Sequence, residues 1–259
     1  MKPSSQISVS LAGMMLCWAP MAAAQPQASS TEAAASATSV DPNVVQALQR
    51  MGAYLGTLKT FSIRANTTID QEIDNGQKVQ LSGQVTYRVR RPDAFHIEVS
   101  SDRQVRQFYY DGKALTVFAP RLGYYATVAA PDTIAKTLDA AYAKYDIALP
   151  LQDLFTWSDA NLGRADFLQS AVHIGYAQID GVDTDHYAMR ESALDWQIWI
   201  RRGERPLPMK VAIVSTGVES QPQYTTNLTW VENPKLTDAE FRFGKPKGSL
   251  PIQIVALED

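Results

Sequence analysis

The sequence of 259 residues contains a single cysteine, Cys17, and only three histidines. One cysteine cannot form an internal disulfide, and it supplies no thiolate cluster for a zinc site. The sequence also lacks the motifs G-x-S-x-G, S-x-x-K and H-E-x-x-H, which mark serine hydrolases, penicillin-binding enzymes and zinc proteases. We therefore expect a protein that is not an enzyme and that holds no cofactor.

Long hydrophobic runs are also absent, except for one near the N-terminus. The mostly apolar stretch from Ile7 to Met21 is short for a membrane span, and it follows the basic Lys2. Small residues, Ala22 to Ala24, then precede Gln25 as a cleavage site. Leu16 stands where a lipoprotein signal needs a small residue before the cysteine. Residues 1–24 are thus predicted to be a signal peptide for export to the periplasm, leaving a mature chain without a transmembrane segment.

The sequence also has no excess of basic over acidic side chains. Removal of residues 1–24 takes away one basic and no acidic side chain, which leaves 23 basic and 27 acidic side chains and a net charge of −4. A protein that binds nucleic acid usually carries a basic surface. We therefore do not expect a nucleic-acid partner.

The mature chain begins with a segment that is poor in large apolar residues. Residues 25–40 are rich in Ala, Ser and Thr, so they are predicted to form a flexible leader. Asp41 and Pro42 then fit the start of a helix, with apolar residues at helical spacing as far as Leu55. Because no later linker divides the chain, we expect one domain over residues 41–250 and a C-terminal tail over residues 251–259.

Alternation of apolar and polar residues dominates the chain after this helix. Val79, Leu81, Val85, Tyr87 and Val89 are separated by polar residues, which indicates a strand with one face packed and one in water. The turn signals Asn75-Gly76 and Asp111-Gly112 join such strands into an antiparallel meander. Apolar segments after Pro131 and Pro150 interrupt the strands with helices, and the alternation resumes near Ala171. The predicted fold class is therefore mainly β with helices.

Several motifs in this order resemble one family. They are G-Q-V-T-Y-R-V-R-R-P-D-A-F (83–95), Y-D-G-K-A-L-T-V-F-A-P (110–120), L-P-M-K-V (207–211) and D-A-E-F-R-F-G-K-P-K-G (238–248). Together they are similar to the Lol-type (LolA/LolB-like) periplasmic lipoprotein carriers. The segments G-V-D-T-D-H (181–186) and D-W-Q-I-W-I (195–200) resemble an uncharacterised periplasmic branch of that superfamily.

The resemblance implies an incomplete antiparallel β-barrel, here of about ten or eleven strands, whose open mouth is covered by a lid of short helices. In the carriers an arginine at the turn after the matching strand bonds this lid, and Arg91 occupies that position. The alternative for Arg91 is a solvated charge at a strand end. The barrel would enclose an apolar cavity for acyl chains.

Apolar residues on the packed face and on the predicted lid are the candidates for the cavity wall. The alternative is that they form an ordinary core. The candidates are Val85, Tyr87, Val89, Phe95, Ile97, Val117, Trp196, Ile198, Ile200, Val211 and Ile213 from the strands, and Leu138, Leu154 and Trp157 from the lid.

Asp183, Asp185 and His186 are weak candidates for a metal site, because carboxylates and an imidazole are common ligands. Their alternation fits a hairpin strand with one wet face equally well. The function predicted from all of these patterns is a monomeric periplasmic protein that carries or senses a lipid or an acylated protein. The alternatives are a sensor or scaffold that regulates an envelope protein partner and, as the least favoured, a hydrolase of unknown type.

Overall fold

The computed structural model describes residues 39–156 and 167–256. The predicted signal peptide, most of the predicted leader and the predicted lid residue Trp157 lie outside these ranges. Within the described residues, none of the helices has the length and apolar character needed to span a membrane.

Twelve strands form one sheet in the order β12-β6-β5-β4-β3-β2-β1-β11-β10-β9-β8-β7. Neighbours are antiparallel except β12 and β6, which pair in parallel. In the described structure the two end strands, β7 and β12, do not pair with each other, so the sheet is open. The predicted fold class, an incomplete antiparallel barrel, is confirmed, with slightly more strands than expected. The strands are β1 (Thr60–Glu72), β2 (Lys78–Arg90), β3 (Ala94–Ser101), β4 (Val105–Tyr110), β5 (Ala114–Ala119), β6 (Tyr124–Ala129), β7 (Ser170–Ile179), β8 (Val182–Arg190), β9 (Leu194–Arg201), β10 (Pro208–Ser215), β11 (Gln223–Glu232) and β12 (Leu250–Pro251).

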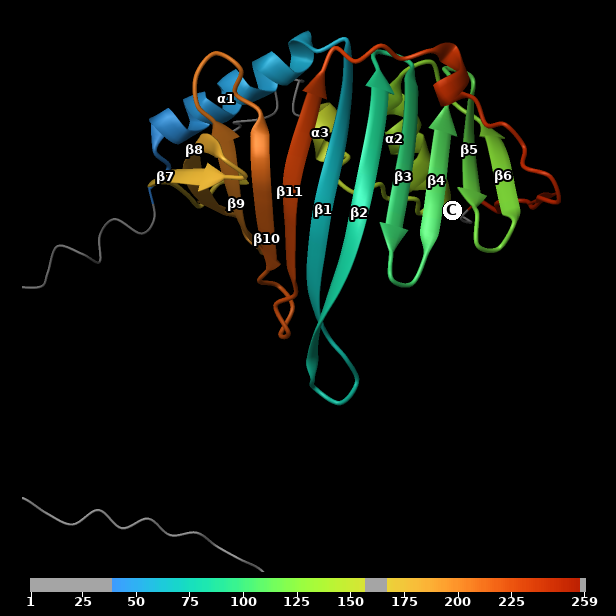
Figure 1. Cartoon of the computed structure of the whole chain (residues 1–259). Coiled ribbons are helices and arrows are strands. Elements are labelled where there is room, and N and C mark those ends of the chain that lie inside the picture. The colour runs from blue at the N-terminus through green and yellow to red at the C-terminus, as the bar shows by residue number, and fades with distance from the viewer. Residues whose placement is uncertain (1–38, 157–166, 257–259) are drawn as a thin grey trace, which may run out of the picture. The chain divides into compact units, whose positions relative to one another are not determined.

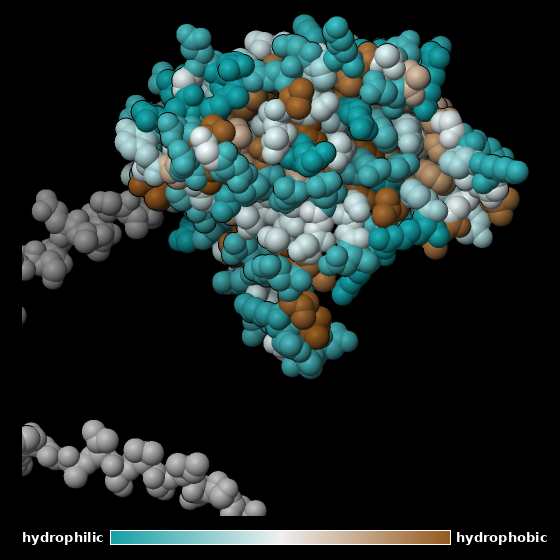
Figure 2. Space-filling view, in the orientation of Figure 1, coloured by the Kyte–Doolittle hydropathy of each residue, from teal (hydrophilic) through white to brown (hydrophobic). Residues whose placement is uncertain are grey.

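The alternation in the sequence corresponds to two different faces of this sheet. Val85, Tyr87 and Val89 on β2 are buried, and the residues between them are partly exposed. Cross-strand pairing continues the same face sideways, because Tyr87 lies opposite Ile63 on β1 and Ile97 on β3. We call this buried side the inner face. The other side, seen in Figure 2, is mainly hydrophilic or neutral.

Strands β1 and β2 are the longest in the sheet and form a hairpin that projects beyond its neighbours (Figure 1). Its turn contains Gly76 with φ of +80°, a conformation that glycine adopts without steric cost. The Gly76 N–H donates to the Ile73 carbonyl at 2.8 Å. The Asn75-Gly76 signal therefore predicted this turn correctly.

Three α-helices border the sheet in the described part of the chain. Helix α1 (Pro42–Thr57) begins where predicted, because Asp41 accepts a hydrogen bond from the Asn43 N–H at 2.8 Å. It lies along one end of strands β8 to β11, whereas α2 (Ile134–Tyr145) and α3 (Asp153–Thr156) lie on one side of the sheet (Figure 1). Helix α2 starts three residues later than Pro131 because Thr133 provides the N-cap.

The C-terminal segment folds back onto the edge of the sheet that β4, β5 and β6 form. After the 3-10 helix η2 (Asp238–Phe241), Phe243 packs on the outer face, with ring centroids 5.0–5.5 Å from those of Tyr109, Phe118 and Tyr125. Backbone hydrogen bonds then join β12 to β6, including one of 2.9 Å from the Leu250 N–H to the Gly123 carbonyl. The hydrogen-bonding edge of β6 is therefore paired with a segment of the same chain.

Candidate ligand-binding site

The inner face is packed in one region and hollow in another. At the end near the β1–β2 hairpin it surrounds a cavity of about 290 Å³, which we call the mouth cavity. Several strands and loops contribute to its wall. The lining residues are Thr67, Ile69, Gln71, Leu81, Ser82, Gly83, Val85, Val99, Ser100, Ser101, Asp102, Arg103, Gln104, Pro150 and Tyr224.

Gly83 lies in the wall of the mouth cavity at a point of close contact. A Cβ atom at this position would be 3.0 Å from both the Ser100 carbonyl oxygen and Thr67 Oγ1. Such a contact requires the neighbouring strand or side chain to move. Glycine at this position therefore lets β2 lie this close to β1 and β3 at the cavity.

The segment before α3 separates the hollow region from the packed one. Tyr87 donates a hydrogen bond from its hydroxyl to the Pro150 carbonyl, and Pro150 is also in the cavity wall. The Phe155 ring lies 6.1 Å from the Tyr87 ring and 6.3 Å from the Phe61 ring. Because Phe61 and Tyr87 are almost fully buried, the inner face beneath α3 is closed.

The residues predicted to line the cavity lie mainly in the packed region and only in one case in the mouth cavity. Val85 lines the mouth cavity. Nine others are in the packed hydrophobic core, to which Val85 also belongs, and three are partly buried against that core. Of all these residues, only Val85 is in the wall of the mouth cavity. The nine are Tyr87, Val89, Phe95, Ile97, Leu138, Leu154, Ile198, Ile200 and Val211, and the three are Val117, Trp196 and Ile213.

Arg91 follows β2 and lies among elements of the predicted lid. It lines a second cavity of about 360 Å³ together with Ile134 from α2 and Phe155 from α3. Its guanidinium carbon is 5.8 Å from the centre of the Phe61 ring. The position fits a contact with the lid, and the latch role itself stays a prediction.

The three weak metal candidates are not gathered around one point. Asp185 and His186 are consecutive in β8, so they point to opposite faces. His186 stacks on Trp199, with ring centroids 4.0 Å apart, whereas Asp185 is 3.5 Å from His173 Nε2 on the inner side. Among the described residues, no group of three or more His, Cys, Asp and Glu side chains is placed to hold a metal ion.

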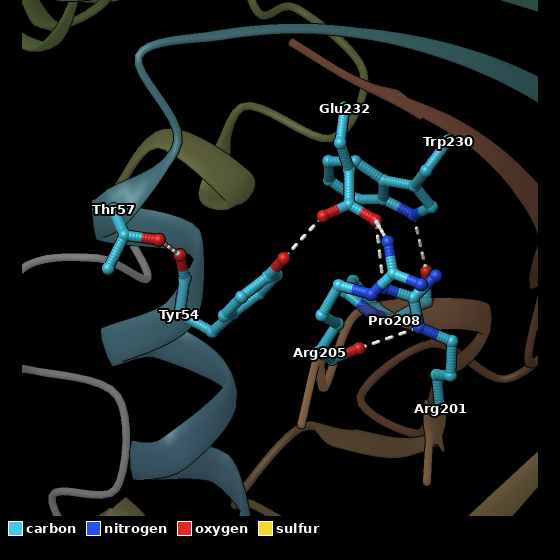
Figure 3. Close-up of polar contacts among 7 residues, drawn as sticks. All are labelled: Tyr54, Thr57, Arg201, Arg205, Pro208, Trp230 and Glu232. Atoms are coloured by element: carbon cyan, nitrogen blue, oxygen red, sulfur yellow. Dashed lines mark hydrogen bonds and ion pairs between the residues drawn. The ribbon is translucent and has the colours of Figure 1, made fainter. Parts of the chain in front are cut away.

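A polar cluster joins α1 to the end of the sheet (Figure 3). Glu232 accepts hydrogen bonds from the Tyr54 hydroxyl and from Arg201 Nη2, the latter at 2.9 Å, and Arg205 Nη1 is 3.5 Å away. Burial raises the pKa of Glu232, but the hydrogen bonds and the two arginine charges outweigh this and lower the pKa below its ordinary value. Burial, together with the neighbouring Glu232, raises the pKa of Tyr54. The cluster therefore holds α1 against β9 and β11.

Buried hydroxyl groups occur on the inner face of β11. The hydroxyl oxygen of Tyr224 and Thr226 Oγ1 are both shielded from solvent. Burial raises the pKa of Tyr224, and the neighbouring Thr226 hydroxyl partly offsets this effect. Of these two residues, Tyr224 is part of the wall of the mouth cavity.

Most of the mouth cavity was not predicted from the sequence. Ile69, Leu81, Val99 and Tyr224 line it but were not selected as candidates. One usable signal was the length of the β1–β2 hairpin, because Ile69 and Leu81 continue the inner-face alternation toward its projecting end. No comparable signal pointed to Tyr224, whose pairing with Ile69 depends on the sheet topology.

Comparison with known proteins gives one family match. The model of a family described as "Predicted periplasmic protein (DUF2092)" matches residues 44–255, which is most of the chain. The chain belongs to this family. The predicted periplasmic location and the predicted uncharacterised branch are confirmed by the description of the DUF2092 family. A search of curated protein sequences finds no match.

Solved structures similar to this DUF2092 protein have low sequence identity. The lipoprotein LppX of Mycobacterium tuberculosis is 14% identical with a TM-score of 0.46, and the match covers 76% of this chain and 98% of LppX. LprF of Mycobacterium bovis is 15% identical with a TM-score of 0.47, covering 76% and 97%. MucB in complex with MucA from Pseudomonas aeruginosa is 11% identical with a TM-score of 0.41, covering 78% and 61%.

Proposed function

We propose that this DUF2092 protein binds an acyl-chain ligand, a lipid or an acylated protein, in the mouth cavity. The observation that supports the proposal is a cavity on the inner face of an open sheet, at the one end that α1, α2 and α3 leave uncovered in the described structure. Its volume of about 290 Å³ is just below the range of about 300–1,000 Å³ that holds drug-sized ligands. One acyl chain suits this volume better than several.

The chemistry of the wall fits an amphiphile. Ile69, Leu81 and Val99 give apolar surface, and Ser101 and Gln104 give a polar rim. Each methylene that moves from water into an apolar site contributes about 0.8 kcal/mol, so part of a chain is enough for useful affinity. The polar part of the ligand would stay near the rim.

Release of such a ligand requires only a limited movement. The carbonyl of Pro150 is in the cavity wall and is tied to the sheet by the Tyr87 hydroxyl. Opening of this contact would widen the cavity at the cost of about one hydrogen bond, roughly 1 kcal/mol. Transfer would then proceed downhill to an acceptor that binds the ligand more tightly.

A pair of variants on the same hairpin tests the proposal. Ile69 lines the cavity, whereas Ile73 lies at the end of the hairpin with 39% of its surface exposed. A fluorescent fatty acid should bind the mature protein and be displaced by natural lipid. Ile69→Glu should remain folded by circular dichroism and lose this binding, because it places a charge in the apolar wall. Ile73→Glu should bind like the unmodified protein.

Two outcomes would contradict the proposal. One is the absence of saturable binding to the unmodified protein, which would favour the alternative of a sensor or scaffold that acts on a partner protein. The other is equal binding by Ile69→Glu and Ile73→Glu, which would locate the ligand outside the mouth cavity.

A further inference from the structure

A third cavity, of about 360 Å³, lies between α1 and the strands β8 and β9. We call it the arginine pocket, because Arg50, Arg201 and Arg202 are in its wall. It shares no lining residue with the mouth cavity, and it is at the end of the sheet that α1 borders, away from the projecting β1–β2 hairpin (Figure 1). The acyl-binding site proposed above therefore does not include it.

Local structure brings two of these arginines to the pocket from different elements. On α1, Ala47 is buried and lines the pocket, and Arg50 follows on the same helical face three residues later. On β9, Ile200 is buried on the inner face, and Arg202 continues this alternation two residues further along the chain. Two guanidinium groups from distant parts of the chain thus line one cavity.

Arg201, the third arginine, is already bound by the protein itself. Its Nη2 donates to Glu232 at 2.9 Å, and its Nε donates to the Arg205 carbonyl at 2.6 Å. It therefore belongs to the polar cluster that holds α1 in place. A ligand in the pocket would depend on Arg50 and Arg202.

Most donors of Arg50 and Arg202 are not used by the protein. Arg202 stacks on an aromatic ring, with its guanidinium carbon 4.4 Å from the centre of the Tyr176 ring, and its Nε is 3.7 Å from Asp185 Oδ2. Within residues 39–156 and 167–256, its two Nη atoms have no acceptor, and Arg50 has neither an ion pair nor a hydrogen bond. The stacking restrains the Arg202 guanidinium and leaves its Nη atoms for a ligand.

The remaining charges leave the pocket positive. Among the described lining residues Asp185 is the only carboxylate, and His173 Nε2 lies 3.5 Å from it in addition to Arg202. Two available arginines against this one paired carboxylate give an excess of one positive charge. The mature chain as a whole has 23 basic and 27 acidic side chains. Binding of an anion would therefore come from this pocket and not from a general attraction.

The tyrosine in the wall shows that the two arginines act on one place. Burial raises the pKa of Tyr187, and the charge of Asp185 raises it further, whereas the charges of Arg50 and Arg202 oppose this effect. Both guanidinium groups are thus near enough to influence the same hydroxyl group. One small anion in the pocket would be near both of them.

We propose that the arginine pocket binds a phosphate monoester group, with Arg50 and Arg202 as donors to the phosphate oxygens. A phosphate is tetrahedral, so its oxygens can accept hydrogen bonds from guanidinium groups that belong to two elements. A carboxylate is planar and has only two oxygens, which one guanidinium group can occupy. The buried Ala47 and Ile200 would contact the organic part of the ligand. A soluble phosphate ester and the headgroup of phosphatidic acid share this chemistry.

Calorimetric titration with two soluble probes tests the pocket. Glycerol 3-phosphate carries the phosphate monoester, and glycerate carries a carboxylate on a similar backbone. The mature protein should bind glycerol 3-phosphate saturably and more tightly than glycerate. Arg50→Gln and Arg202→Gln should each weaken this binding roughly tenfold, the effect of losing hydrogen bonds from a charged donor. Arg64→Gln removes an exposed arginine of β1 and should leave the affinity unchanged.

Vesicles separate the two sources of the phosphate group. The protein is floated with phosphatidylcholine vesicles that contain or lack phosphatidic acid. Saturable binding of glycerol 3-phosphate assigns the pocket to a soluble ester. Binding only to the vesicles with phosphatidic acid, reduced in Arg50→Gln and retained in Arg64→Gln, assigns it to a lipid headgroup at a membrane surface.

Failure of this proposal is distinct from failure of the acyl-binding site. No binding to either phosphate probe, equal affinity for glycerate, binding that survives both substitutions, or an equal loss in Arg64→Gln overturns the proposal. Arg50→Gln removes no ion pair or hydrogen bond among the described residues, so it should unfold at the same temperature as the unmodified protein and remains informative if Arg202→Gln does not fold. Ile69→Glu, which alters the mouth cavity, should bind the phosphate probe like the unmodified protein.

Discussion

At the scale of single residues, Glu232 is the clearest case of a charge that the fold depends on. Its side chain is 15% exposed and is bound by Tyr54 from α1 and by Arg201 from β9. Charged groups in such surroundings stabilise a protein only while each partner is present. The two arginines and the tyrosine hydroxyl would be left without their common acceptor if this carboxylate were lost.

Substitution of this carboxylate should therefore destabilise the protein. Glu232→Gln should reduce the free energy of unfolding by about 2 kcal/mol, since hydrogen bonds to a charged group are replaced by weaker ones. Urea denaturation followed by circular dichroism measures the change. Glu219→Gln, which alters an exposed acidic residue, serves as the control and should change the free energy by less than about 0.5 kcal/mol.

The pH dependence of this effect has a defined sign. The pKa of Glu232 is lower in the folded protein than its ordinary value of 4.5. Stability from the ionised group is thus fully present above about pH 4.5 and is lost as the pH falls through the lower folded pKa. The difference in unfolding free energy between the unmodified protein and Glu232→Gln should shrink below this pH. A difference that is constant from pH 7 to pH 3 would contradict the ionised cluster.

At the scale of elements, the short helix α3 determines which part of the inner face is closed. Phe155 reaches across to Phe61 and Tyr87, and all three are buried. Phe155→Ala should cost about 3–5 kcal/mol in unfolding free energy, as expected for a large ring removed from a packed core. Tyr142→Ala on the exposed side of α2 is the control, with a change of about 0.5 kcal/mol. Equal effects would mean that α3 does not pack as described.

The turn after β2 offers a second test of these elements. Arg91 lies in the wall of a cavity that α2 and α3 share. If its guanidinium latches the lid, Arg91→Leu should accelerate exchange of a bound fluorescent fatty acid in stopped-flow measurements, through loss of a charge-assisted contact of about 1.5–3 kcal/mol. Arg64→Leu on the outer face of β1 should leave the rate unchanged. Unchanged exchange and unchanged stability in Arg91→Leu would show that the guanidinium does not hold the lid.

The same elements show what the sequence could and could not predict. Alternation along β2 correctly indicated that Leu81, Val85 and Tyr87 share one face. Alternation cannot tell that Tyr87 is packed beneath Phe155 while Leu81 faces a cavity, because this depends on where a helix from a distant part of the chain lies. Tyr224 was missed as a wall residue for the same reason, since β1 and β11 are paired across more than half of the chain.

At the scale of the whole molecule, one sheet joins strands from both halves of the chain. Strands from both halves meet at the pairing of β1 with β11, so neither half has a complete sheet by itself. Chemical unfolding should therefore be a single transition, with far-UV circular dichroism and tryptophan fluorescence giving the same midpoint. Two separate midpoints would show that the strands before and after α3 unfold as independent domains.

The mouth cavity is central to the proposed function, because it is where the acyl ligand would lie. Native mass spectrometry of the protein extracted gently from the periplasm tests this most directly, with Ile69→Glu prepared in parallel. We predict a species heavier than the bare chain by the mass of one acyl lipid or acylated partner, which is absent from Ile69→Glu and retained by Ile73→Glu. The mass of the bare chain alone in the unmodified protein, or the same added mass in Ile69→Glu, would contradict it.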